Sequence, residues 1–150
     1  MIPLLKVSVL HSILITTGVQ WWQIISVLIT HIGTSAFELC RNITSLTLGN
    51  SVQEIGKYSF ESVSIESLVI PASVTTIDKY AFARCKSLAS VTFLGLPEAM
   101  SNAFEGSTSL SEIHYTGSIS EWNSIAAGTN WDYGFNYYVV YCSDSELSKW

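Results

Sequence analysis

Phenylalanine recurs at a fixed interval along the middle of this chain. Phe37, Phe60, Phe82 and Phe104 are separated by 23, 22 and 22 residues, and a small residue directly precedes each of them. A period of about 20–30 residues is typical of solenoids, in which each repeat is one structural unit stacked on the previous one. This period constrains the fold more strongly than any other feature of the sequence.

Other positions keep the same register as the phenylalanines. An isoleucine stands five residues before the first three of them, at Ile32, Ile55 and Ile77. A second column follows three residues after each phenylalanine and contains Cys40, Val63, Cys85 and Ser107. An alternating apolar pair then completes each unit: Leu46 and Leu48, Leu68 and Ile70, Val91 and Phe93, Ile113 and Tyr115. Columns that share one register predict the core positions of stacked repeats.

The alternating pairs predict a short strand in every unit, and residues 44–48 give the clearest case. Because successive strand residues point to opposite sides, Leu46 and Leu48 should face the core while Ser45 and Thr47 face solvent. The stretches around the phenylalanines are too short for full helices, and we expect a single helical turn there. The sequence therefore predicts a repeat β-solenoid of mostly short strands with single helical turns.

The period divides the chain into three parts. Residues 32–115 hold four repeats of 22–23 residues, and residues 116–150 break the period and are predicted to form a C-terminal cap of one helix and one strand. Ser118 with Glu121 three residues later is typical of a capping box at a helix start, and Gly128 would end the helix. Residues 137–141 favour a closing strand, and residues 143–150 are expected to be frayed. Aromatic side chains of this part would cover the open end of the solenoid: Trp122, Trp131, Phe135 and Tyr137.

Residues 1–31 fit the repeat poorly and leave three interpretations open. We favour a degenerate N-terminal repeat or cap, because terminal repeats are atypical and Ile29 with Ile32 matches Val52 with Ile55. The alternatives are a signal-like segment without a clear cleavage site, or a truncated or altered start of a longer protein. Polar residues interrupt the apolar stretch too often for a membrane span, so we expect no transmembrane span.

Charge and composition exclude some classes of partner. The net charge is −5, and the five lysines and two arginines are scattered singly, whereas nucleic-acid binding needs a clustered basic face. Hydrophobic residues make up 48% of the chain, which is enough for a continuous core. We therefore expect no nucleic-acid partner.

The three cysteines do not predict a disulfide framework. Cys40 and Cys85 share a repeat column but lie two units apart, on the order of 10 Å at strand spacing. A disulfide needs Cα atoms closer than about 7 Å, so we interpret both as small buried hydrophobic residues. Cys142 stands alone, and its role stays open.

The repeat units resemble the BspA-like leucine-rich repeat family. Residues 55–60 (IGKYSF) and 77–88 (IDKYAFARCKSL) are similar to its I-G-x-x-A-F-x-x-C-x-x-L pattern, and residues 115–125 are similar to the cap that often follows such repeats. The resemblance covers about residues 32–142 and implies a β-solenoid of the leucine-rich-repeat type on secreted or surface proteins of bacteria and some protists. It also implies adhesion or other protein contacts and brings no catalytic residues. Asp78 and Met100 depart from the pattern where it has glycine.

Few residues point to chemistry of their own. The histidines His11, His31 and His114 are too dispersed for a metal site, and the sequence contains no hydrolase or phosphate-binding motif. We therefore expect no catalytic, metal-binding or cofactor-binding residues, and we interpret the protein as not an enzyme. A hydrolase is the minor alternative, and it would require converging carboxylates in a pocket.

The candidate binding surface is the outward face of the strands, since repeat proteins use such extended surfaces for partners. It should present two rows: Ser45, Ser67, Ser90 and Glu112, then Thr47, Val69, Thr92 and His114. We expect a monomer that recognises a protein, such as an extracellular-matrix or host surface protein, from an extracellular or cell-surface location. The alternatives are an ordinary strand surface and a structural spacer within a longer repeat protein. The rows lack an exposed Trp, Tyr or Arg of the kind that dominates binding hot spots.

Overall fold

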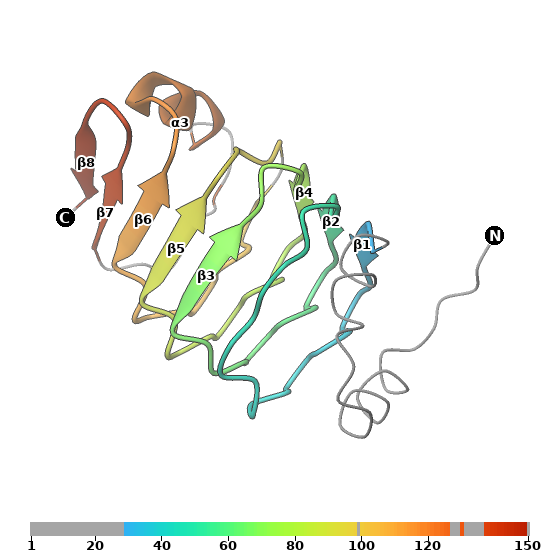
Figure 1. The fold of residues 1–150 in the computed structure, drawn as a ribbon. Helices are drawn as coiled ribbons and strands as arrows, with labels where there is room; N and C mark the ends of the chain where they lie inside the picture. Colours follow the sequence, from blue (N-terminus) through green and yellow to red (C-terminus); the bar gives the residue numbers. More distant parts are fainter. Residues whose placement is uncertain (1–28, 99, 127–129, 131–136, 150) are drawn as a thin grey trace.

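The computed structural model describes residues 29–98, 100–126, 130 and 137–149. Over these residues the chain winds into a β-solenoid of about four turns with almost no helix (Figure 1). The predicted fold class is confirmed. The N-terminal stretch up to residue 28, Gly128, Trp131 and Phe135 lie outside the described residues, and so do the predictions made for them.

Two sheets run along the solenoid. The first is parallel and three-stranded, with β1 (His31–Ile32), β2 (Glu54–Ile55) and β4 (Thr76–Ile77) in that order. The second is five-stranded, in the order β3 (Ser67–Ile70), β5 (Ser90–Phe93), β6 (Glu112–Tyr115), β7 (Tyr138–Tyr141) and β8 (Glu146–Lys149). All neighbours in it are parallel except β7 and β8, which form an antiparallel pair. Helix α3 (Ile119–Ala126) follows β6 at one end of the solenoid (Figure 1).

The phenylalanine column forms a stack inside the solenoid. Ring centroids are 5.0 Å apart for Phe37 and Phe60, 5.2 Å for Phe60 and Phe82, and 5.5 Å for Phe82 and Phe104, with nearly parallel planes. These distances are close to the strand spacing of about 4.8 Å, because the backbone fixes the separation of equivalent residues. The last three rings are fully buried, so the predicted core column is confirmed.

The backbone around each phenylalanine repeats in an unusual conformation. The residues two before and two after each ring have positive φ, between 54° and 74°: Ser35 and Leu39, Tyr58 and Ser62, Tyr80 and Arg84, Asn102 and Gly106. The structure refines the expected helical turn into consecutive turns with alternating left-handed residues. Each such residue other than glycine costs about 1–3 kcal/mol of folding free energy. The conformation persists only where the surrounding structure holds it in place.

A hydrogen-bond ladder between neighbouring turns holds this conformation. The amide of Phe37 donates to Ser59 O at 2.7 Å, and the amide of Phe60 donates to Ala81 O at 2.8 Å. The amide of Phe82 repeats the contact one unit further on. The amides of the residues directly before and directly after each phenylalanine instead donate to carbonyls of their own turn. Since buried amides must be paired, each turn needs its neighbour.

The column that follows the phenylalanines supplies polar contacts between turns. The Cys85 thiol donates to Phe60 O at 3.3 Å, and the Ser107 hydroxyl donates to Phe82 O at 2.8 Å. Ser107 Oγ also accepts from the Cys85 amide at 3.0 Å. Serine can therefore replace cysteine in this column because both side chains donate to the preceding turn.

Two sequence predictions are wrong at the N-terminal side. Residues 44–48 have the expected alternation, with Leu48 buried and Thr47 exposed, but they form no strand. Ser64 N donates to Ile43 O at 2.9 Å, and no further backbone bond joins the described residues 44–48 to β3. Cys40 is exposed, whereas Cys85 is buried as expected. Cys85 is enclosed by described turns on both sides, while Cys40 belongs to the first described turn.

The C-terminal side both confirms and corrects the prediction. Ser118 N donates to Glu121 Oε2 at 2.8 Å and Glu121 N donates to Ser118 Oγ at 3.3 Å, which confirms the capping box. Trp122 is buried at an angle to Phe93. The residues expected to fray instead form β8, because their backbone pairs with β7 through four residue pairs. Asp144, in the connection before β8, accepts from Ile119 N at 2.9 Å and adds a second contact to the helix start.

Truncation of the phenylalanine stack should destabilise the whole solenoid. We expect Phe60→Ala or Phe82→Ala to lower the free energy of unfolding by about 3–5 kcal/mol, because each leaves a cavity in the core. Chemical denaturation measures this loss, with exposed Lys86→Ala as the control. Unchanged stability in both phenylalanine variants would contradict the core role of the stack.

Two buried serines should respond differently to replacement by alanine. Ser107 makes both contacts described above, so Ser107→Ala should cost about 1–3 kcal/mol, and Ser107→Cys should recover part of that loss. The Ser59 hydroxyl is buried without a hydrogen-bond partner among the described residues, and alanine occupies its column at positions 36, 81 and 103. Ser59→Ala should therefore leave the melting temperature unchanged or raise it. A comparable loss in Ser59→Ala and Ser107→Ala would contradict this.

The helix cap should depend on pH. Hydrogen bonds from the Ser118 amide and hydroxyl lower the pKa of Glu121 below its ordinary value of 4.5. A lowered folded-state pKa stabilises the cap above the ordinary value, and the contribution disappears as pH falls through the lowered pKa. Amide-exchange protection of α3, compared with Glu121→Gln, should lose its advantage as pH falls below 4.5 and through the lowered pKa. Glu66→Gln serves as the control, and an advantage that stays constant with pH would refute the prediction.

Candidate interaction surface

The outward residues of the five-stranded sheet form two continuous rows. Strand register places Ser67 beside Ser90, Glu112 and Val139 in the first row. The second row joins Val69, Thr92, His114 and Tyr141. The residues between them, such as Leu68 and Val91, are buried. Six of the eight residues predicted for the binding surface therefore lie together on one face.

The remaining two predicted residues do not join these rows. Ser45 and Thr47 are exposed, but they lie in the stretch that forms no strand, so no register aligns them with Ser67 and Val69. We define the sheet face as the outward residues of β3, β5, β6, β7 and β8. Ser45 and Thr47 are excluded from it.

Tyr141 is an aromatic residue of the sheet face that the sequence analysis did not assign to it. Its side chain is 37% exposed, and its ring stacks on His114 with centroids 5.0 Å apart and an interplanar angle of 15°. His114 Nε2 in turn lies 3.5 Å from Glu112 Oε2. The alternation in residues 137–141 predicted the strand, and extension of the rows by one strand would have found Tyr141. The eight residues predicted for the rows contain no Trp, Tyr or Arg, and strand pairing adds Tyr141 to the second row.

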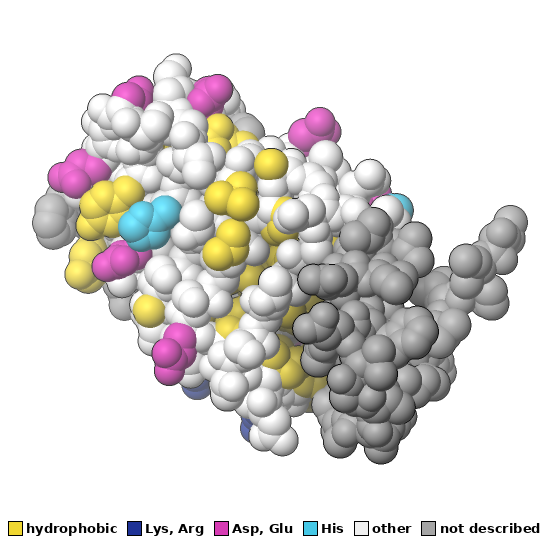
Figure 2. Space-filling view, viewed as in Figure 1, with side chains coloured by type: hydrophobic (Ala, Val, Ile, Leu, Met, Phe, Trp, Pro, Cys, Tyr) yellow, Lys and Arg dark blue, Asp and Glu magenta, His cyan; other side chains and the backbone are white. Residues whose placement is uncertain are grey.

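Apolar and acidic side chains share this side of the molecule. Val69 is 50% exposed at the β3 end of its row, and Leu94, directly after β5, is also exposed. Figure 2 shows a histidine beside hydrophobic and acidic side chains over the sheet, with Lys and Arg atoms visible only at the lower margin. The sheet face therefore combines exposed apolar side chains with acidic ones.

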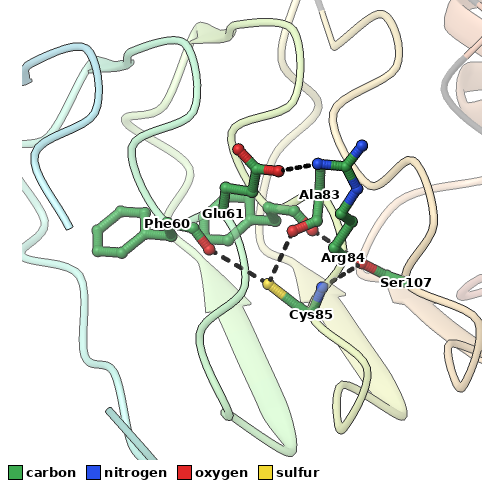
Figure 3. Close-up of polar contacts among 7 residues, drawn as sticks. Phe60, Glu61, Ala83, Arg84, Cys85 and Ser107 are labelled. Carbon is green, nitrogen blue, oxygen red and sulfur yellow. Dashed lines mark hydrogen bonds and ion pairs between the residues drawn. The ribbon is translucent and has the colours of Figure 1, made fainter. Parts of the chain in front are cut away.

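The turns carry a second feature, a shallow hollow of about 400 Å³. Its lining includes the stacked rings of Tyr58 and Tyr80, whose centroids are 5.1 Å apart. Arg84 Nη1 lies 2.5 Å from Glu61 Oε1, and the Glu61 side chain is only 7% exposed (Figure 3). This ion pair joins two neighbouring turns and neutralises the buried carboxylate.

Cys85 lies next to this ion pair but has no nucleophilic character. Burial raises the pKa of its thiol to about 11, so the protonated form dominates at neutral pH. The thiol donates to Phe60 O and also lies 3.7 Å from Ala83 O (Figure 3). Since the thiolate is the reactive form, Cys85 acts as a structural donor.

The described part of the chain offers no clustered metal ligands and no membrane-spanning helix. Among its residues, no group of three or more His, Cys, Asp or Glu side chains could hold a metal ion. The same residues include no helix of the length and apolar character needed to cross a membrane.

The chain was compared with known families and proteins. A family model described as the BspA type leucine-rich repeat region, in six copies, matches residues 22–127. No curated protein matches the chain. A leucine-rich repeat protein from Bacteroides ovatus ATCC 8483, known from its crystal structure, is similar with a TM-score of 0.50 and 29% sequence identity. That match covers 57% of this chain and 23% of the other, so this chain spans less than a quarter of its structural neighbour.

The family match begins before the first predicted repeat and ends after the last one. The division into residues 1–31, 32–115 and 116–150 stays a prediction. Both similarities are to leucine-rich repeats, and the family model covers more than half of the chain. The protein therefore belongs to the BspA type leucine-rich repeat family.

Proposed function

We propose that this protein is a non-enzymatic recognition module that binds another protein through its sheet face. The single observation that carries the proposal is the pair of in-register outward rows, which ends at the exposed Tyr141. Tyrosine is among the residues that dominate binding energy at interfaces. Leucine-rich repeat families are generally non-enzymatic and interact with proteins, which supports this class of function.

The rigidity of the face supports the same proposal. Parallel strand pairing fixes the rows, and the buried residues between them anchor each strand to the core. A rigid surface loses little conformational entropy when it binds, which favours affinity. Stacking on His114 further restricts the Tyr141 ring.

The proposed partner is an extracellular-matrix or host surface protein, and the proposed location is extracellular or on the cell surface. BspA-like repeats are typical of surface or secreted bacterial proteins, which supports both statements. The protein would act as a monomer, with the sheet face free for its partner. A structural spacer without binding of its own is the alternative outcome of the test below.

Variants of the sheet face should separate these two functions. Binding of the full chain to immobilised, purified extracellular-matrix proteins is measured by surface plasmon resonance. We expect Tyr141→Ala or Thr92→Glu to weaken binding about tenfold or more, as for other hot-spot residues. Exposed positions on the turns provide matched controls, Lys79→Ala and Thr34→Glu, which should bind like the wild type.

Two results would count against the proposal. If both face variants bind like the wild type, the sheet face is not the binding surface. If the wild type binds none of the matrix proteins, the spacer interpretation replaces recognition. Circular dichroism of every variant verifies that the solenoid is intact.

A further inference from the structure

Charge is distributed unevenly over the strands of the sheet face. Glu112 lies in the outward row of β6, and Glu146 pairs with the outward Tyr141. Lys149 is the only lysine or arginine in the five strands. The other lysines and arginines of the described chain belong to turns and loops, at Arg41, Lys57, Lys79, Arg84 and Lys86. Among the side chains that the structure describes, the outward charges of the five strands are therefore carboxylates.

These carboxylates flank the aromatic stack. His114 covers one side of the Tyr141 ring, and Glu146 is the next residue along the sheet on the other side. At the other end of the stack, the Glu112 carboxylate contacts the His114 ring. Glu146 makes no ion pair with any described side chain. We call Glu112, His114, Tyr141 and Glu146 the acidic end of the sheet face.

We propose that the acidic end binds a lysine- or arginine-rich segment of the partner protein. This inference rests on the proposed function and adds the chemistry of the partner. An ammonium or guanidinium group is attracted to a tyrosine ring and to the carboxylates beside it. An acidic segment would be repelled by both carboxylates, so charge complementarity selects a basic partner.

The hollow on the turns is a weaker candidate for the same ligand. Its most buried carboxylate, Glu61, is already paired with Arg84, and Glu105 Oε2 accepts from Asn102 Nδ2 at 3.0 Å. A cationic group there would compete with existing contacts. Glu146 on the sheet face offers its carboxylate without that competition.

Two double variants with equal net charge test the proposal. Glu112→Gln with Glu146→Gln removes the carboxylates of the acidic end. Glu38→Gln with Glu98→Gln removes two exposed carboxylates elsewhere. The probes are a fluorescent ten-residue peptide of alternating Arg and Ser and a matched peptide of alternating Glu and Ser. Binding is followed by fluorescence anisotropy at low and at physiological salt.

We expect the basic peptide to bind the wild-type protein, and we expect its affinity to fall as the salt concentration rises. The face variant should lose about tenfold in affinity and the control variant about twofold or less. Tyr141→Ser should weaken binding, whereas Tyr141→Phe should retain it because the ring is kept.

Three results would overturn the proposal: equal losses in the two double variants, equal binding of the acidic peptide, or no binding of the basic peptide. None of these results decides whether matrix proteins bind the sheet face, because that binding is measured separately. Failure of the charge inference is therefore distinguishable from failure of the proposed function. Glutamine keeps the size of glutamate, and circular dichroism verifies folding of each variant.

Discussion

Backbone hydrogen bonds between consecutive phenylalanine turns hold the rest of the structure in place. Each turn contains two residues with positive φ, a conformation that an isolated peptide would rarely adopt. The neighbouring turn stabilises it by accepting every second amide, as Ala81 does for Phe60. The same contacts set the distance between coils, and the rings stack at about 5 Å as a result. Stability is therefore shared between neighbouring repeats, as expected for a solenoid.

The candidate binding surface is a consequence of this stacking. Because the coils repeat in register, equivalent outward residues of β3, β5, β6 and β7 become continuous rows. In the interior, Cys85 and Ser107 occupy the same column and make the same contact to the preceding turn. The outward side chains of the rows face solvent and make no such contact to the core. Tyr141 and Glu146 give one end of the sheet a chemistry that the other strands lack.

Much of this architecture could be predicted from the sequence, and the exceptions have physical causes. The phenylalanine, isoleucine and alternating columns predicted the core because they report side-chain burial at each unit. The same alternation in residues 44–48 buries Leu48 but forms no strand, since a strand also requires backbone partners. Cys40 and Cys85 share a column and differ in burial, because burial depends on the turns at both sides. β8 was missed because its pairing with β7 leaves no period in the sequence.

The sequence by itself determined the repeat, its core columns and most of the two rows of outward residues, because these follow from periodicity along the chain. The tertiary structure decided which residues complete the surface. Tyr141 reaches His114 from 27 positions further along the chain, and Glu146 reaches Tyr141 through an antiparallel turn. Neither pairing repeats at the 22-residue spacing, because each depends on how the last strands fold back onto the sheet. Periodicity describes the interior of the solenoid, and the contacts at its end give the surface its individual chemistry.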